Sequence, residues 1–448
     1  MSSATTIQSL PNELLIAIAA AAQLGCGVNE PINSRPEWIL SHFCRRFRHV
    51  IIAAPALWSN LSICLNHVQQ RERLEEIFKL FLRRSIPLNV AVSLRILSPA
   101  ADATNVLADW LSQIVPEFNR VQSLSVALES NRDDLAGEFV PLCHLAAPNL
   151  LHVDIAIIST SRSSLPTRRC PVELFSFGAP KLSSVRMRGF FPFPTPTWIS
   201  SPTRLELDNV GRLLDGDDIH YLSIVMQPLA LVYLRLDLSE VLFVPADQIR
   251  IPSLKFLSVT VDDGDGQYLQ KIVNLFDCTA LTEFTFVGTH GDQIMWLLDM
   301  PYLRSSYPLL HTLSFINTEQ PRCHCASSGI VVPTRTHFSE IPLFPALSSL
   351  VLINQCFTSY LLREIFSTRA MPWPCLKMLT LSLEFSLEYG SGDVRRTLRD
   401  TIRHSSQTIP KLRLCRTLFF LAEGQEGGVD VEVFDPEETV KRFRVVDD

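Results

Sequence analysis

The chain has 448 residues, of which 47% are apolar and 19% are charged, and its net charge at pH 7 is −6. This length predicts about three domains or one elongated repeat array. Lys and Arg form no basic stripe; we therefore expect no nucleic-acid partner, because non-specific binding to nucleic acid depends on clustered cations.

The 11 cysteines are scattered and odd in number, unlike the dense and paired cysteines of small secreted domains. The apolar stretch Leu14–Leu24 has no Lys or Arg before it, which argues against a secretory signal. No run of about 18 or more apolar residues occurs, so we expect no membrane partner. These features predict a cytoplasmic or nuclear location.

The start of the chain predicts a short helix. Residues 1–8 are rich in Ser and Thr and are expected to be disordered. Ser9 can cap a helix that starts near Pro11, an early position at which the missing N–H of proline costs little. The apolar residues at helical spacing in this helix are Leu14, Leu15 and Ile18.

A loop and a second helix are predicted next. Residues 25–37 are rich in Gly, Pro and Asn, which is a loop signature. From near Glu37 to Pro55, apolar residues recur at helical spacing and predict one helix. They are Trp38, Ile39, Phe43, Phe47, Val50 and Ile51. A short apolar segment follows Pro55 and ends this region. Its apolar residues are Leu57, Trp58, Leu61 and Ile63.

Residues 64–120 are expected to form a helical linker and the cap of a repeat array. Arg71–Arg84 is amphipathic, with its apolar residues at helical spacing, and 104–115 predicts a further helix. A strand-like run, Leu88–Leu97, lies between them.

From about residue 121 a short phrase recurs. It is often a proline, then Leu, two residues, an apolar residue, one residue and another apolar residue. The first copy is Val121, Leu124 and Val126, and the stretch around Leu205 and Leu207 is a degenerate one. The other copies begin at Leu150, Leu182, Leu231, Leu254, Leu281, Leu310, Leu347 and Leu376. Such a phrase places alternate apolar side chains on one face of a short strand, which is buried only when neighbouring units stack.

This phrase, with copies mostly 23 to 37 residues apart, resembles the leucine-rich repeat, whose period is roughly 20–29 residues. The resemblance implies an α/β fold, a solenoid with a parallel sheet over 121–420, and an unknown target protein on its concave face. A compact α/β domain with several parallel strands remains an alternative. The acidic tail, 421–448, is expected to be a loose strand or a disordered end.

Residues 9–63 resemble the F-box. Three landmarks of that family occur in order: Leu-Pro-x-Glu from Leu10, Cys-Arg-x-aromatic from Cys44, and Leu-Trp at Leu57. The long loop before the second helix is similar to fungal members of the family. The order of the three landmarks is more specific than any one of them alone.

The F-box resemblance implies a three-helix unit that docks onto a Skp-type adaptor and, through it, a cullin. The adaptor-binding residues that it implies are Leu10, Pro11, Leu14, Leu15, Ile18, Leu57 and Trp58. The core residues that it implies are Trp38, Phe43, Cys44, Phe47 and Val50. An F-box followed by repeats is the arrangement of a substrate-recognition subunit of an SCF-type ubiquitin ligase, in which ubiquitin transfer occurs on other subunits.

Two other functions stay open. The chain is alternatively a repeat scaffold that binds a protein without engaging the ligase, because Ala19–Ala22 stand where the family usually places larger residues. The second alternative, an enzyme on an α/β fold, is disfavoured because neither G-x-S-x-G nor G-x-x-x-x-G-K occurs. Cys323 and Cys325 are closer together than zinc ligands usually are. We therefore expect no catalytic residue, metal or cofactor.

Overall fold

The computed structural model describes residues 10–24, 35–65, 71–97, 106–129, 136–158, 169–170, 173–189, 191–192, 202–208, 230–238, 248–261, 266–289, 307–317, 344–353, 375–382, 411–415 and 430–441. The chain forms two compact units, Met1–Pro202 (unit 1) and Thr203–Asp448 (unit 2). The expectations for residues 1–8 and for the loop at Cys323 lie outside the described residues.

Unit 1 begins with short helices. They are α1 (Asn12–Leu24), α2 (Pro36–Phe43), α3 (Arg45–Ile52) and the 3-10 helix η3 (Pro55–Trp58). The single helix predicted from Glu37 to Pro55 is wrong, because Cys44 is extended (φ −156°, ψ 170°) and separates α2 from α3. Proline begins both α2 and η3, at the first-turn position where it lacks no needed hydrogen bond.

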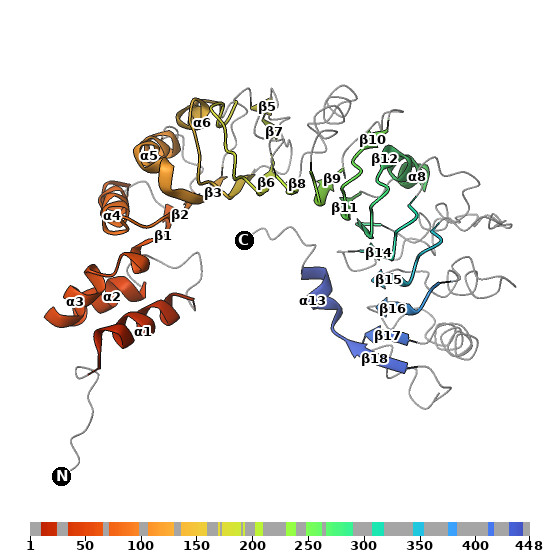
Figure 1. Cartoon of the computed structure of the whole chain (residues 1–448), viewed down its shortest axis with the longest axis horizontal. Helices are drawn as coiled ribbons and strands as arrows, with labels where there is room; N and C mark the ends of the chain where they lie inside the picture. Colours follow the sequence, from red (N-terminus) through yellow and green to blue (C-terminus); the bar gives the residue numbers. More distant parts are fainter. Residues whose placement is uncertain are drawn as a thin grey trace, which may run out of the picture. The chain divides into compact units, whose positions relative to one another are not determined.

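Parallel strands come next, in chain order, in unit 1. They are β1 (Asn60–Leu65), β2 (Val90–Ile96), β3 (Val121–Glu129), β4 (His152–Ile158) and β6 (Ser184–Arg188). Between them come α4 (Arg71–Arg84), α5 (Val106–Ile114), the 3-10 helix η6 (Val115–Arg120) and α6 (Ala136–Cys143). Figure 1 shows α4, α5 and α6 along one side of these strands. The short strands β5 (Arg169–Cys170) and β7 (Phe191–Pro192) pair with each other.

The sheet of unit 1 therefore starts earlier than expected. Residues 64–120 hold the end of β1 and strand β2, and β2 lies within the strand-like run predicted at Leu88–Leu97. In register, Leu61 of β1 lies beside Val92 of β2, which lies beside Leu124 of β3. The buried Trp58 precedes Leu61 by three residues, as Val121 precedes Leu124. Trp58 thus holds the first apolar position of the first repeat.

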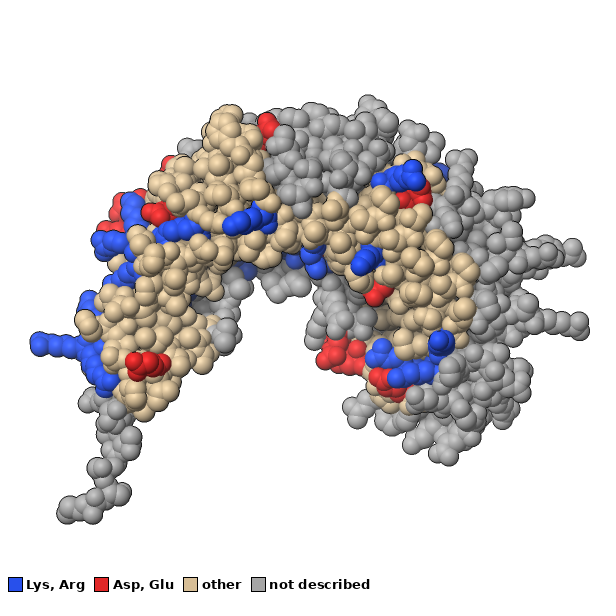
Figure 2. Space-filling model, in the orientation of Figure 1, with Lys and Arg blue, Asp and Glu red and all other residues tan. Residues whose placement is uncertain are grey.

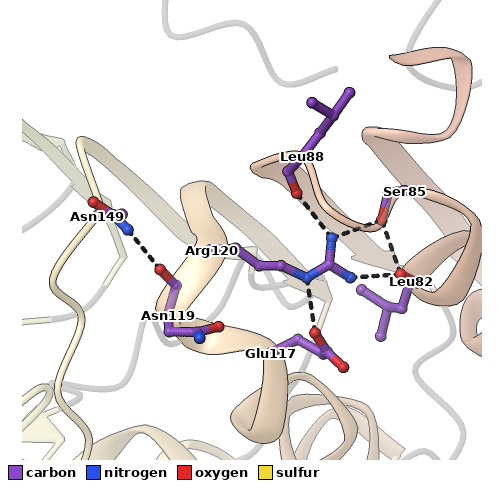
Figure 3. Close-up of polar contacts among 7 residues, drawn as sticks. All are labelled: Leu82, Ser85, Leu88, Glu117, Asn119, Arg120 and Asn149. Carbon is purple, nitrogen blue, oxygen red and sulfur yellow. Dashed lines mark hydrogen bonds and ion pairs between the residues drawn. The ribbon is translucent and has the colours of Figure 1, made fainter. Parts of the chain in front are cut away.

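Arg120 joins successive repeats of unit 1 (Figure 3). Its guanidinium donates to the Leu82 carbonyl at the end of α4, to the Leu88 carbonyl (2.9 Å) and to the Ser85 hydroxyl (3.0 Å). The Glu117 carboxylate accepts from its Nε at 2.7 Å. One side chain of η6 thereby donates to the Leu82 carbonyl in the last turn of α4 and to a carbonyl of the segment that follows the helix.

Unit 2 is a run of parallel strands in chain order. They are β8 (Arg204–Asp208), β9 (Tyr233–Asp237), β11 (Phe256–Thr260), β13 (Glu283–Val287), β14 (Thr312–Ile316), β15 (Ser349–Ile353), β16 (Met378–Ser382), β17 (Lys411–Cys415) and β18 (Asp430–Phe434). Helix α8 (Gly266–Leu275) lies between β11 and β13, and β10 (Ile249–Arg250) pairs with β12 (Phe276–Asp277). The last element is helix α13 (Pro436–Lys441).

Every copy of the recurring phrase lies on one of these parallel strands, and its apolar residues are buried. In unit 2 the central positions align in register as Leu234, Leu257, Phe284, Leu313, Leu350, Leu379 and Leu412. The predicted α/β class with parallel strands is confirmed. Pairing of each strand with the next copy in chain order is typical of a stacked repeat array.

The strand ends impose tight backbone turns. Gly288, just after β13, has φ +81°, and a Cβ there would lie 2.2 Å from the Val261 carbonyl oxygen. Only glycine fits such a position. In the tail, the strand alternative agrees with β18, which pairs with β17, whereas helix α13 after it was not expected.

Candidate protein interface

The N-terminal helices expose large apolar side chains in pairs. Leu14 and Ile18 of α1 are 49% and 45% exposed, and Ile39 and Phe43 of α2 are 51% and 62% exposed. Residues four apart lie on one face of a helix, so each helix presents an apolar pair to solvent. Isolated exposed apolar residues are common, but such pairs on adjoining helices indicate a binding surface.

Cationic side chains border this surface. Figure 2 shows Lys and Arg gathered over α3, beside a largely uncharged surface over α1 and α2. Helix α3 carries Arg45, Arg46 and Arg48, all of which are exposed. An acidic partner would therefore be favoured at this border.

Arg46 also fixes the start of α1. Its guanidinium donates to the Leu10 carbonyl and to the Asn12 side-chain oxygen, the latter at 3.0 Å. Leu10 is half-buried, while Pro11 is exposed. The Leu-Pro corner is thus held in place with its proline open to solvent.

A small core lies beneath the exposed pairs. Leu15, Phe47 and Val50 are buried together, and the partly buried residues packed against them are Leu10, Ile16, Leu40 and Cys44. Leu15, expected on the adaptor surface, is therefore an inward residue. It lies one residue from Leu14, and adjacent helical residues point about 100° apart.

Phe43, expected in the core, is exposed. Its ring packs on Phe47 with the ring centroids 5.3 Å apart. The break at Cys44 turns the chain after Phe43, so that Phe43 and Phe47 do not continue one buried stripe. Trp38 is half-buried beside His42, and Cys44 is half-buried at the break. These positions assign Phe43 to the surface.

Leu57 and Trp58 are fully buried, and they offer no surface to a partner in this structure. The Trp58 indole donates to the Ile51 carbonyl at 2.8 Å. The Arg84 guanidinium lies over its ring, 4.4 Å from the centroid. Trp58 therefore connects the N-terminal helices to α4, which corrects its expected contact with an adaptor.

A buried polar pair, which the sequence did not predict, positions α1 against α2. Gln23 donates from its amide to the Glu37 carboxylate and to the Leu57 carbonyl, both at 2.8 Å. Arg35 lies 3.4 Å from the same carboxylate. A buried carboxylate needs such partners. Nothing in the sequence distinguishes Gln23 and Glu37 from other polar residues such as Glu13. The two side chains meet only because α1 packs against α2.

The described residues contain no group of three or more His, Cys, Asp or Glu placed to hold a metal ion. Burial raises the pKa of the Cys278 thiol to about 12, so that thiol is protonated at neutral pH. None of the described helices is long and apolar enough to cross a membrane.

Comparison with protein-family models and with curated proteins gives no match. The likeness to the F-box and to leucine-rich repeats therefore rests on the motifs and on the geometry of the helices and strands.

Proposed function

We propose that this chain is the substrate-recognition subunit of an SCF-type ubiquitin ligase. Residues 9–63 bind a Skp-type adaptor, and the repeats bind a target protein. The observation that carries the proposal is the exposure of Leu14, Ile18, Ile39 and Phe43 on helices that hold the F-box-like motifs.

Burial of these side chains would supply the binding energy. A Leu, Ile or Phe side chain that moves from water into an interface contributes roughly 1.5–3 kcal/mol. Interfaces concentrate their energy in a few such anchors. The buried Leu15, Phe47 and Val50 hold the anchors on a fixed base, so little ordering entropy is lost on binding.

The chain itself would perform no chemistry. It would hold a target near the charged enzyme of the ligase and so raise the effective concentration of one at the other. Its cofactor requirement is accordingly none, and its location would be the cytoplasm or nucleus.

A repeat scaffold without ligase engagement is the second candidate. Ala20–Ala22, one turn beyond Ile18, are exposed and add little apolar area to the α1 surface. Adaptor binding separates the two functions, because only the ligase subunit requires it.

The test is a pull-down of a purified Skp-type adaptor by the purified full-length chain. Leu14→Asp puts a charge into the proposed interface and is expected to abolish capture. Val140→Asp is the matched control, since Val140 is an exposed apolar residue on α6 of the same unit. Equal capture by the Leu14→Asp chain and the wild type would sink the assignment, provided that circular dichroism shows both folded.

A further inference from the structure

On the face of the unit 2 sheet opposite the recurring phrase, the last strand position is polar in β8, β9 and β11, apolar in β13, β14 and β15, and polar again at Ser382 of β16. Asp208 and Asp237 occupy the last position of β8 and β9. The same position of β13, β14 and β15 holds Val287, Ile316 and Ile353, which lie side by side in register and are buried. We name these three residues the apolar strip. Side chains alternate across a strand, so the strip points away from Phe286, Phe315 and Leu352.

The chain's own C-terminal helix covers part of this strip. Val440 of α13 is buried and packs with Ile316 and Ile353, and Val351 and Phe434 pack around that cluster. Figure 1 shows α13 on the side of the unit 2 sheet opposite to α8. The preceding strand, β18, pairs with β17, and so the chain turns back across the sheet to reach β14 and β15.

The two parts of the tail are held very differently. Strand β18 is anchored by ladder pairing, by the Lys411–Glu432 ion pair (2.6 Å) and by the Arg413 guanidinium 5.4 Å from the Phe434 ring centroid. Helix α13 spans six residues, too few to be stable alone. Among Pro436, Glu437, Glu438 and Val440, whose side chains the structure describes, Val440 is the buried one. Asp435 lies between β18 and α13, and its carboxylate accepts a hydrogen bond from the Glu437 N–H at 2.9 Å.

We propose that α13 is a displaceable strap, and that the apolar strip beneath it binds a short acidic helical segment of the target protein. The proposal rests on the proposed target-binding role of the repeats. The target segment is expected to resemble the strap that it replaces. In the strap, a branched aliphatic residue, Val440, follows a negatively charged first turn that contains the exposed Glu437 and Glu438. A partner with a larger apolar anchor competes with Val440 for Ile316 and Ile353 once it overcomes the tethered strap's effective concentration.

The first arm of the test measures opening of the strap. A thiol is introduced in the full-length chain by Val440→Cys, and its alkylation under native conditions is followed by mass spectrometry. Cys278 is a built-in reference, because it is fully buried in the same unit. A strap that opens locally exposes the new thiol at least about tenfold faster than Cys278, which reacts through global unfolding. Equal rates for the two thiols would overturn the strap.

The second arm measures occupancy of the strip. A fluorescent peptide with the sequence of residues 430–441 is titrated into the full-length Val440→Asp chain and into the wild type. We expect at least tenfold tighter binding to Val440→Asp, because its strap no longer competes, and loss of binding when the peptide itself carries Val440→Asp. Val140→Asp in the chain is the control, because Val140 is an exposed residue of α6 in unit 1, and this variant should behave as the wild type does.

A peptide that binds neither chain, or both equally, overturns the strip as a binding site. Should Val440→Asp fail to fold, Val440→Ala replaces it. Neither arm uses the adaptor, so failure here leaves the ligase assignment standing, and failure of adaptor capture leaves the strap standing.

Discussion

The rings of Trp58 and Phe81 meet edge to face, with their centroids 4.9 Å apart and their planes at 72°. Trp58 ends the 3-10 helix at the close of the stretch that resembles an F-box, and Phe81 belongs to α4, which comes after the first strand of the sheet. The two residues make the N-terminal helices continuous with the repeat array.

Two aromatic residues of the N-terminal motif are expected to behave in opposite ways. Trp58→Ala should lower the free energy of unfolding by about 3–5 kcal/mol, because it empties a buried site. Phe43→Ala should change it by less than about 1 kcal/mol, because its ring is mostly exposed. Urea denaturation followed by tryptophan fluorescence and circular dichroism measures both. A larger loss for Phe43→Ala than for Trp58→Ala contradicts the burial of these two rings.

Arg120→Ala should destabilise unit 1 by roughly 1–3 kcal/mol, because the Leu88 carbonyl loses its Arg120 donor and the Leu82 carbonyl keeps the Ser85 hydroxyl but loses the guanidinium. Arg120→Lys should rescue little, since an ammonium lacks the guanidinium fork. Lys79→Ala, which removes an exposed ion pair with Glu75, is the control and should change stability by less than about 0.5 kcal/mol. Thermal melts of the three variants measure these differences. Equal melting temperatures would contradict a stabilising role for the hydrogen bonds of Arg120.

Gly288→Ala should cost about 2 kcal/mol or more in unfolding free energy, because the new Cβ meets the Val261 carbonyl at a positive φ. Gly178 also has a positive φ, +97°, but a Cβ there has nothing within 4 Å. Gly178→Ala should therefore cost only about 1 kcal/mol. The ranking of the two in chemical denaturation is the measurement, and a reversed ranking contradicts the close approach.

The Cys278 thiol should make stability depend on alkaline pH. Its pKa is raised by burial from 9.0 to about 12, so the unfolded chain releases this proton first and stability falls as pH rises from 9 towards 12. Between pH 8 and 10 the loss should be about 1.4 kcal/mol. The difference in unfolding free energy between wild type and Cys278→Ala should shrink by that amount. Cys375→Ala, at an exposed position, is the control, and a difference that is constant with pH would refute the assignment.

The strands were predictable from the sequence because the apolar residues of each phrase are the residues that the strand buries. Each leucine from Leu150 to Leu376 that begins a copy leads into a parallel strand. Strand β1 was missed because Trp58, and not leucine, fills its first position. Strand β17 carries Leu412 and Leu414 but lay beyond the last copy recognised.

The N-terminal surface was harder to predict. Spacing alone cannot distinguish Leu14 from Leu15, because which of two adjacent residues faces inward depends on the partner helix. Helical spacing also runs unbroken across Cys44, whose extended backbone is visible only in three dimensions. The burial of Trp58 depends on Phe81 and Arg84, which lie more than a helix away in the sequence.

Calorimetric titration of the purified full-length chain with a purified Skp-type adaptor measures the interaction on which the ligase assignment depends. The account predicts a dissociation constant on the order of 1 µM or tighter for the wild type and for Val140→Asp. It predicts at least tenfold weaker binding for Phe43→Asp, about 1.4 kcal/mol. No binding by a folded wild-type chain, or equal binding by Phe43→Asp, would contradict it.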